Sequence, residues 1–294
     1  MQGTLGFFVF ILGTIIGSFL NVVILRTNTG ASLRGRSRCF TCGLQLRWYD
    51  LFPIVSYIFL RGRCRSCKSS ISRQYVIVEI LTGLLFLGTY LKLGPSYGNS
   101  AISIPEAIAG FPWGILILYW AIWSLFVVIA VYDLRHKIIP DFFLSMLIVL
   151  AVFRIVAAIL VEHADFVDTI KALSVGPLLA LPLLIIWYFS SGRAMGFGDV
   201  KLAFAMGLFL SVKQAIAVFV LSFWIGGAIS IILLAATRVA RLCLRKNVLN
   251  LRRARVTMKR EIPFAPFLVA GIAVVFFCSI DIFSVLSVFE RLWL

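Results

Sequence analysis

The chain has 294 residues, of which 61% are hydrophobic and 14% charged, and its formal net charge is +16. A soluble domain of this size does not carry so much apolar surface, whereas membrane-spanning helices need about 20 mostly apolar residues each. The basic residues gather in the polar segments between apolar runs, which argues against nucleic acid as the partner and indicates a polytopic membrane protein.

The apolar runs predict an all-α fold of about eight transmembrane helices. No positive charge precedes the first run and an arginine follows it, so we expect a retained helix and not a cleaved signal peptide. The sixth run would cover only about 16 Å as a helix, so it must merge with flanking residues or lie in a thinned, water-accessible part of the bundle. The predicted spans are residues 5–25, 76–93, 114–132, 142–161, 173–189, 200–210, 215–236 and 264–288.

The charges of the connections predict the orientation of the protein. Arginine and lysine concentrate in the odd-numbered connections, whereas Glu106, Glu162, Asp165 and Asp168 lie in the even-numbered ones. The positive-inside rule therefore places the N-terminus outside and every basic loop in the cytoplasm. The last basic loop, residues 238–260, is expected either to lie along anionic headgroups of membrane lipids or to be a solvated connector.

The lengths of the connections predict three parts. Residues 1–25 form the first transmembrane helix, residues 26–75 form a small cytoplasmic loop domain, and residues 76–294 form a seven-helix membrane domain. Only the first cytoplasmic loop is long enough for a domain of its own.

That loop contains two Cys-x-x-Cys pairs. Two such turns supply four sulfurs in a tetrahedron, which suits Zn²⁺ and leaves no coordination position open. A cytoplasmic location disfavours stable disulfides, and nearby arginines favour thiolates. We predict a structural zinc site that stabilises a loop too small for its own core, with a redox pair or free thiols as alternatives. The predicted zinc ligands are Cys39, Cys42, Cys64 and Cys67.

A pair of aspartates is the predicted catalytic site. Asp199 follows two glycines in Gly196-Phe-Gly-Asp199, at a membrane boundary where an ionisable residue indicates function, and Asp133 ends the third apolar run on the same predicted side. Two carboxyl groups that share a site do not easily ionise together, so one stays protonated. The charged one accepts a proton from a water that attacks a peptide carbonyl, and the neutral one donates to the carbonyl oxygen. This pattern predicts an aspartyl protease at the membrane surface.

Other polar residues near the spans are expected to have structural roles. Asp141 is interpreted as a helix cap or a surface charge, which are the common roles of a single aspartate at a helix boundary, and not as a member of the catalytic pair. His136 is expected to contact the loop or the headgroups. Asn21 and Glu79 are expected to hydrogen-bond across the helix bundle, with substrate contact as the alternative.

Taken together, these motifs resemble those of the bacterial type IV prepilin peptidases, which are membrane aspartyl proteases of the GxGD type. The resemblance runs almost from end to end of the chain. It is carried by Gly17-Ser-Phe-Leu-Asn21, the four cysteines at their spacing, Trp48-Tyr-Asp50, Tyr132-Asp133, Gly196-Phe-Gly-Asp199-Val-Lys201 and Pro263-Phe-Ala-Pro266-Phe-Leu268.

The resemblance implies an enzyme of the bacterial inner membrane whose active site faces the cytoplasm. It would cleave the short basic leader from prepilins of type IV pili and from pseudopilins of type II secretion, with the residues that match Asp133 and Asp199 as the catalytic pair. Many members also methylate the new N-terminus with S-adenosylmethionine, an activity usually linked to the cysteine loop. We expect this second activity to be possible here, although no glycine-rich nucleotide motif on a strand-to-helix turn is present in the sequence.

Two alternatives from other classes remain at this point. The Tyr-Asp and Gly-x-Gly-Asp motifs are shared with presenilin-like intramembrane proteases, which cleave within a spanning helix. A transporter or assembly subunit with a zinc-stapled loop would instead use the aspartates to bind ions.

Overall fold

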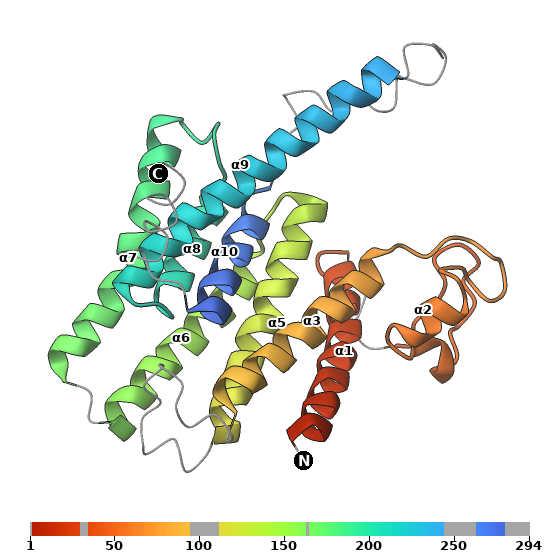
Figure 1. Ribbon diagram of the computed structural model, residues 1–294, viewed down its shortest axis with the longest axis horizontal. Coiled ribbons are helices and arrows are strands. Elements are labelled where there is room, and N and C mark those ends of the chain that lie inside the picture. The colour runs from red at the N-terminus through yellow and green to blue at the C-terminus, as the bar shows by residue number, and fades with distance from the viewer. Residues whose placement is uncertain (1, 30–34, 95–111, 163–164, 244–262, 280–294) are drawn as a thin grey trace, which may run out of the picture. The chain divides into compact units, whose positions relative to one another are not determined.

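The computed structural model describes residues 2–29, 35–94, 112–162, 165–243 and 263–279, and within these ranges its regular secondary structure is helical (Figure 1). No strand occurs in the described residues, where two isolated β-bridges, Arg38–Gln45 and Arg63–Ser70, are the only extended pairings. The predicted all-α fold is therefore confirmed.

Each of the eight predicted spans coincides with a helix. Five of these helices are long and apolar enough to cross a membrane, namely those that begin at residues 2, 74, 112, 166 and 212. The end of the predicted eighth span and most of the last basic loop lie outside the described residues. The helices are α1 (Gln2–Arg26), α3 (Gln74–Leu93), α5 (Pro112–His136), α6 (Asp141–Glu162), α7 (Phe166–Phe189), α8 (Phe197–Gly207), α9 (Val212–Cys243) and α10 (Ala265–Cys278).

The chain separates into two compact units. The first consists of Met1–Val131 and Val152–Asp165, and the second of Tyr132–Ala151 and Phe166–Leu294. The cysteine loop belongs to the first unit, whereas Asp133 and Asp199 both belong to the second. The three-part division expected from the connection lengths stays a prediction.

In the first unit, α1 and α3 pack closely along their length. The packing depends on a small residue, because a Cβ atom at Gly17 would come within 2.9 Å of the Cα atom of Glu79. Asn21, one turn further along α1, donates a hydrogen bond to the carbonyl of Tyr75 in α3 (3.2 Å). Further along α3, Phe86 stacks on Trp120 of α5 with 5.1 Å between the ring centroids. Close contact and the interhelical hydrogen bond together join the two ends of the cysteine loop.

In the second unit, the short helix α8 is packed between longer elements. It contacts α7 and α10, and α9 contacts α10. Leu202, Ala203 and Met206 of α8 are completely buried. The predicted sixth span is as short as expected, but the helix begins at Phe197 and not at Val200, so Asp199 lies inside its first turn.

Candidate functional site

The two Cys-x-x-Cys segments fold into the same turn. In each, the N–H of the first cysteine bonds a carbonyl five residues later, from Cys39 to Leu44 (2.9 Å) and from Cys64 to Ser69 (2.8 Å). The residue after the second cysteine takes a positive φ, +69° at Gly43 and +57° at Lys68. The paired motifs therefore form two matching turns that present their sulfurs in the same way.

The sulfurs of these two turns fit a tetrahedral metal ion. The four Sγ atoms lie within 4.8 Å of one another, and those of Cys39 and Cys67 are 3.8 Å apart. A tetrahedron with Zn–S distances of about 2.3 Å has edges of about 3.8 Å. Hydrogen bonds from the backbone N–H groups of Cys42 and Thr41 lower the pKa of Cys39 to about 6, whereas desolvation and the neighbouring sulfurs of Cys39 and Cys67 raise the pKa of Cys42 to about 11. The cluster is compatible with structural zinc, and all four predicted ligands are in place.

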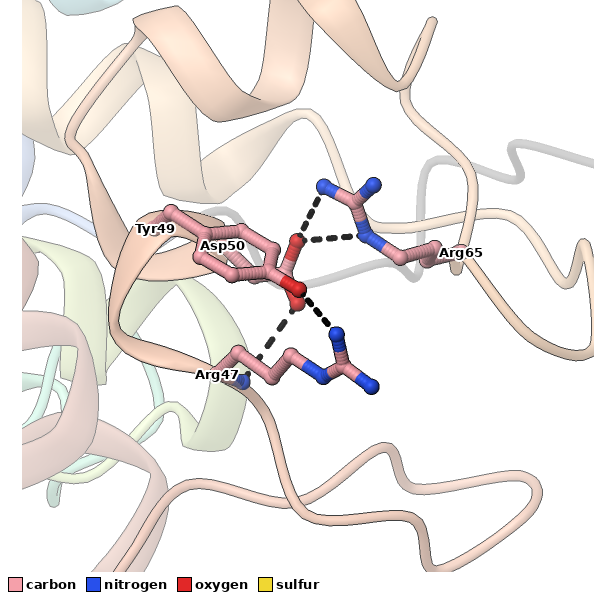
Figure 2. Close-up of polar contacts among 4 residues, drawn as sticks. All are labelled: Arg47, Tyr49, Asp50 and Arg65. Carbon is pink, nitrogen blue, oxygen red and sulfur yellow. Dashed lines mark hydrogen bonds and ion pairs between the residues drawn. The ribbon is translucent and has the colours of Figure 1, made fainter.

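An ion pair joins the second cysteine turn to the 3₁₀ helix η1 (Trp48–Leu51), as Figure 2 shows. Arg65 donates to one carboxylate oxygen of Asp50 through Nε (2.9 Å) and Nη2 (2.7 Å). The backbone N–H of Arg47 donates to the other oxygen (3.4 Å), and the Arg65 guanidinium lies 4.9 Å from the ring centroid of Tyr49. These contacts connect the Trp-Tyr-Asp segment, which lies between the cysteine pairs, to the second cysteine turn.

Glu79 attaches the loop to the helix pair. Its carboxylate is buried in α3 and accepts the backbone N–H of Ile54 at 2.7 Å, and Ser18 of α1 lies close to it. The predicted structural roles of Asn21 and Glu79 thus have partners in the structure. Sequence reasoning did not identify Ile54, because nothing in the sequence shows which loop amide approaches α3.

Asp133 and Asp199, 66 positions apart in sequence, come together in the second unit. Asp133 lies in the last turn of α5 and is 5% exposed, whereas Asp199 lies in the first turn of α8 and is 7% exposed. Asp199 is close enough to Asp133 to experience its charge. Within the described residues, Oδ2 of Asp133 and Oδ1 of Asp199 are buried without a hydrogen-bond partner. Each carboxyl group therefore has one oxygen that forms no structural hydrogen bond in this part of the chain and is available for another interaction.

Backbone amides lie near both carboxyl groups. The amide of Ala265, at the start of α10, is close to Asp133, and the amide of Gly196 is close to Asp199. The role of Ala265 was missed from the sequence. The sequence signal for Ala265 is the Pro263-Phe-Ala-Pro266 motif. This motif predicts the start of a helix but does not indicate which residue lies opposite the first N–H groups of that helix.

The glycine before Asp199 permits a close approach between the two segments that carry the aspartates. A Cβ atom at Gly198 would lie 3.1 Å from the Cβ of Ile139, six residues after Asp133. Gly196 has an ordinary extended conformation (φ −76°, ψ 148°), so this glycine does not supply a sharp turn. Gly198 contributes by having no side chain, which lets the start of α8 lie against the segment that follows α5.

An ion pair lies beside this contact. Asp141, the first residue of α6, accepts a hydrogen bond from Nζ of Lys201, two residues after Asp199 (2.7 Å). Both side chains are exposed, which agrees with the expectation that Asp141 is not a member of the catalytic pair. His136 stacks on Tyr132 with 4.5 Å between the ring centroids, so it contacts its own helix.

Comparison with known families gives two matches that follow each other along the chain. Residues 11–93 match the bacterial peptidase A24 N-terminal domain, and residues 120–231 match the type IV leader peptidase family. The first match contains the cysteine loop and the second contains both aspartates. No solved structure matches this chain.

Curated relatives carry the name prepilin leader peptidase/N-methyltransferase. One from Vibrio cholerae is 30% identical over 72% of this chain and 80% of its own length. One from Burkholderia pseudomallei is 27% identical over 95% of this chain and 87% of its own length. A third from Myxococcus xanthus is 35% identical over 78% of this chain, and the chain spans only 63% of that relative's length. On these matches, the chain belongs to the type IV leader peptidase family.

Proposed function

We propose that this protein is an aspartic endopeptidase that removes the leader of type IV prepilins and type II secretion pseudopilins at the cytoplasmic face of the inner membrane, with Asp133 and Asp199 as its catalytic pair. The observation that carries the proposal is the pairing of two buried carboxyl groups, each with one oxygen that makes no hydrogen bond within the described residues. The family match favours this function over a presenilin-like protease or a transporter.

The geometry suits a reaction in which the two carboxyl groups have opposite roles. Because like charges repel at close range, a pair that shares one proton is favoured over two carboxylates. The charged oxygen takes a proton from a water molecule, which then attacks the carbonyl carbon of the scissile peptide. The protonated partner donates its proton to the carbonyl oxygen, which gives a tetrahedral diol. The proton taken from water then passes to the leaving amine as the C–N bond breaks, and a diol hydroxyl returns a proton to the partner carboxylate. The pair titrates as a unit, so neither aspartate is assigned as the acid.

The backbone contacts of the site keep the two free oxygens available. The backbone amides of Ala265 and Gly196 each lie close to one aspartate, so a polar group is present there without a competing side chain. Burial of both groups reduces the access of bulk water, which strengthens electrostatic interactions within the site. The residues that surround the pair therefore position it and leave the chemistry to the two carboxyl groups.

The cysteine loop is proposed to bind one structural Zn²⁺ through Cys39, Cys42, Cys64 and Cys67. A bound zinc would cross-link the two turns, and four protein ligands would leave it no position for substrate. N-methylation of the new terminus with S-adenosylmethionine is proposed as a second activity, because the relatives' name includes N-methyltransferase. We assign no residue of this chain to the binding of S-adenosylmethionine.

Mass spectrometry of a co-expressed prepilin tests both activities. The expected product lacks its leader and, where the second activity is present, carries an added methyl group on the new N-terminal amine. An uncleaved prepilin in the presence of folded, membrane-inserted enzyme would refute the proposed peptidase function. A cleaved but unmethylated product would remove only the methyltransferase activity.

A further inference from the structure

The cysteine loop exposes a set of large apolar side chains outside any spanning helix. They lie in η1, in α2 (Val55–Phe59) and between these helices, at intervals of three and four residues, and each is between 43% and 84% exposed. Trp48 and Phe52 share this surface, since their rings make edge contact at 5.7 Å. We call this set the apolar stripe: Trp48, Leu51, Phe52, Val55, Ile58 and Phe59.

Apart from Phe40 and Leu44 in the first cysteine turn, equally exposed apolar residues of the first unit lie on long apolar helices such as α1, where lipid would cover them. Phe7, Phe8 and Phe19 of α1 are 62%, 63% and 55% exposed. Exposure of this extent to water is unfavourable for a soluble loop, because burial of apolar area drives association with other surfaces. The apolar stripe is therefore expected to have a partner.

The bond between Ile54 and Glu79 shows how close the stripe lies to the membrane. Glu79 is the sixth residue of α3, whose apolar span begins at Gln74, so it lies about 7.5 Å beyond the start of that helix. Its carboxylate holds the N–H of Ile54, the residue immediately before α2. Interfacial amphipathic helices bury their apolar faces about 5–10 Å below the headgroup level, which is a similar depth.

The backbone at Ile54 indicates that this attachment is specific. Ile54 has φ +61° and ψ −52°, a conformation that a β-branched residue adopts only when its surroundings impose it. A buried carboxylate that accepts its N–H compensates for part of that cost. The start of α2 is therefore held against α3 by a defined contact.

The charges at both ends of the stripe complement an anionic membrane surface. Arg47 precedes η1, and Arg61 and Arg63 follow α2, and all three are exposed. Arginine beside apolar and aromatic side chains is typical of segments at the lipid interface, where the cation meets phosphate groups and the apolar groups meet acyl chains.

We propose that residues 48–59 form an interfacial membrane anchor, with the apolar stripe in the boundary between headgroups and acyl chains and with Glu79 setting its depth. One face of the loop would then contact lipid, and the Asp50–Arg65 ion pair would join the second cysteine turn to that face. The partner is the lipid surface at the end of the bundle where α1 finishes and α3 begins, not a peptide.

Photo-crosslinking in the full-length protein tests the anchor. A benzophenone amino acid replaces Phe59, which is 84% exposed, and in a matched control it replaces Ser66, an exposed residue of the second cysteine turn. Both proteins are reconstituted into liposomes that contain phosphatidylglycerol, irradiated with and without a prepilin peptide, and analysed by mass spectrometry. We expect lipid adducts at position 59, several-fold fewer at position 66, and no effect of the peptide.

Two outcomes would overturn the anchor: equal lipid labelling at both positions, or labelling of position 59 that shifts from lipid to the peptide when prepilin is added. The second outcome would identify the stripe as a substrate-docking surface. Cleavage of prepilin by each labelled protein shows that it is folded and inserted.

The role of Glu79 is tested in the same assay. Glu79→Gln keeps an oxygen that accepts the Ile54 N–H, whereas Glu79→Leu has a similar size and no acceptor. We expect position 59 to keep its lipid adducts in Glu79→Gln and to lose them several-fold in Glu79→Leu. Unchanged labelling in Glu79→Leu would show that the depth of the anchor does not depend on this contact.

Discussion

The cysteine cluster and the aspartate pair each gather acidic groups, but they accommodate the repulsion between these groups in opposite ways. Both bring acidic groups from separate parts of the sequence to one place, where their negative charges repel each other. In the cysteine loop, four sulfurs within 4.8 Å of one another form a complete ligand set for one cation. In the second unit, two carboxyl groups have no cation ligand set around them in the described residues, and each keeps an oxygen without a partner.

This difference distinguishes the proposed structural site from the proposed catalytic one. A closed tetrahedral site satisfies every ligand and offers nothing to a substrate. A carboxyl pair stabilised by backbone amides on one side can still exchange a proton on the other. The comparison predicts that damage to the aspartates removes activity with little change in structure, whereas damage to the cysteines changes structure with less effect on cleavage.

The largest expected effect comes from the aspartates themselves. Asp133→Asn and Asp199→Asn should each lower prepilin cleavage by about 10³-fold or more, because general acid–base catalysis by a positioned group contributes about 10²- to 10⁴-fold. Cleavage is measured on a prepilin substrate with purified enzyme in detergent. Asp141→Asn is the matched control, since Asp141 is exposed and paired with Lys201, and it should keep near-normal activity. Full cleavage by either catalytic variant would exclude the mechanism.

A smaller effect is expected from the close contact beside Asp199. Gly198→Ala places a Cβ atom 3.1 Å from Ile139, so the two segments must move apart by a few tenths of an ångström. Because misplacement of reacting groups by about 1 Å can cost about 10²-fold, we expect cleavage to fall about tenfold.

Two further variants sharpen this test. Gly227→Ala is the control, since no atom of the described residues outside its own helix backbone and chain neighbours lies within 4 Å of its Cβ position, and it should have no effect. The double variant Gly198→Ala/Ile139→Ala should recover part of the lost activity, because the smaller side chain makes room for the new methyl group. Additive losses in the double variant would show that Gly198 acts through something other than this contact.

Removal of the metal should affect the loop far more than cleavage. A strong chelator, or Cys64→Ser, is expected to abolish zinc binding and to increase hydrogen exchange throughout residues 35–73, while cleavage falls by less than about tenfold because the closed site takes no part in the reaction. Zinc content is measured by elemental analysis and loop order by hydrogen exchange. Cys278→Ser, at an exposed free thiol in α10, should retain the metal. A metal-free protein with an ordered loop would contradict the zinc assignment.

The smallest effect is expected at the exposed ion pair near the aspartates. Lys201→Met removes a 2.7 Å contact to Asp141, but pairs between exposed side chains contribute only about 0–1 kcal/mol. We expect a change in unfolding free energy of about 1 kcal/mol at most and cleavage within about twofold of the unmodified enzyme. A loss of activity as large as that of the aspartate variants would place Lys201 in the catalytic machinery.

Much of this architecture follows from sequence alone, for local reasons. Apolar length predicts the helices, since a helix satisfies its own backbone hydrogen bonds and needs no information from the rest of the chain. Cys-x-x-Cys predicts its turn in the same way, because its two cysteines are only three positions apart. A four-sulfur metal site needs two such turns. The candidates Asp133 and Asp199 stand out because ionisable residues at membrane boundaries are costly and therefore uncommon.

Tertiary structure decided what touches these residues. The Ala265 amide that meets Asp133, the Ile139 side chain that meets Gly198 and the Ile54 amide that meets Glu79 all come from distant parts of the sequence. A backbone N–H is present at nearly every residue, so no residue type marks the one that will donate. Sequence therefore determined which groups are candidates for the chemistry, whereas only packing determined how they are held. A contact between distant segments is a property of their arrangement and not of either segment.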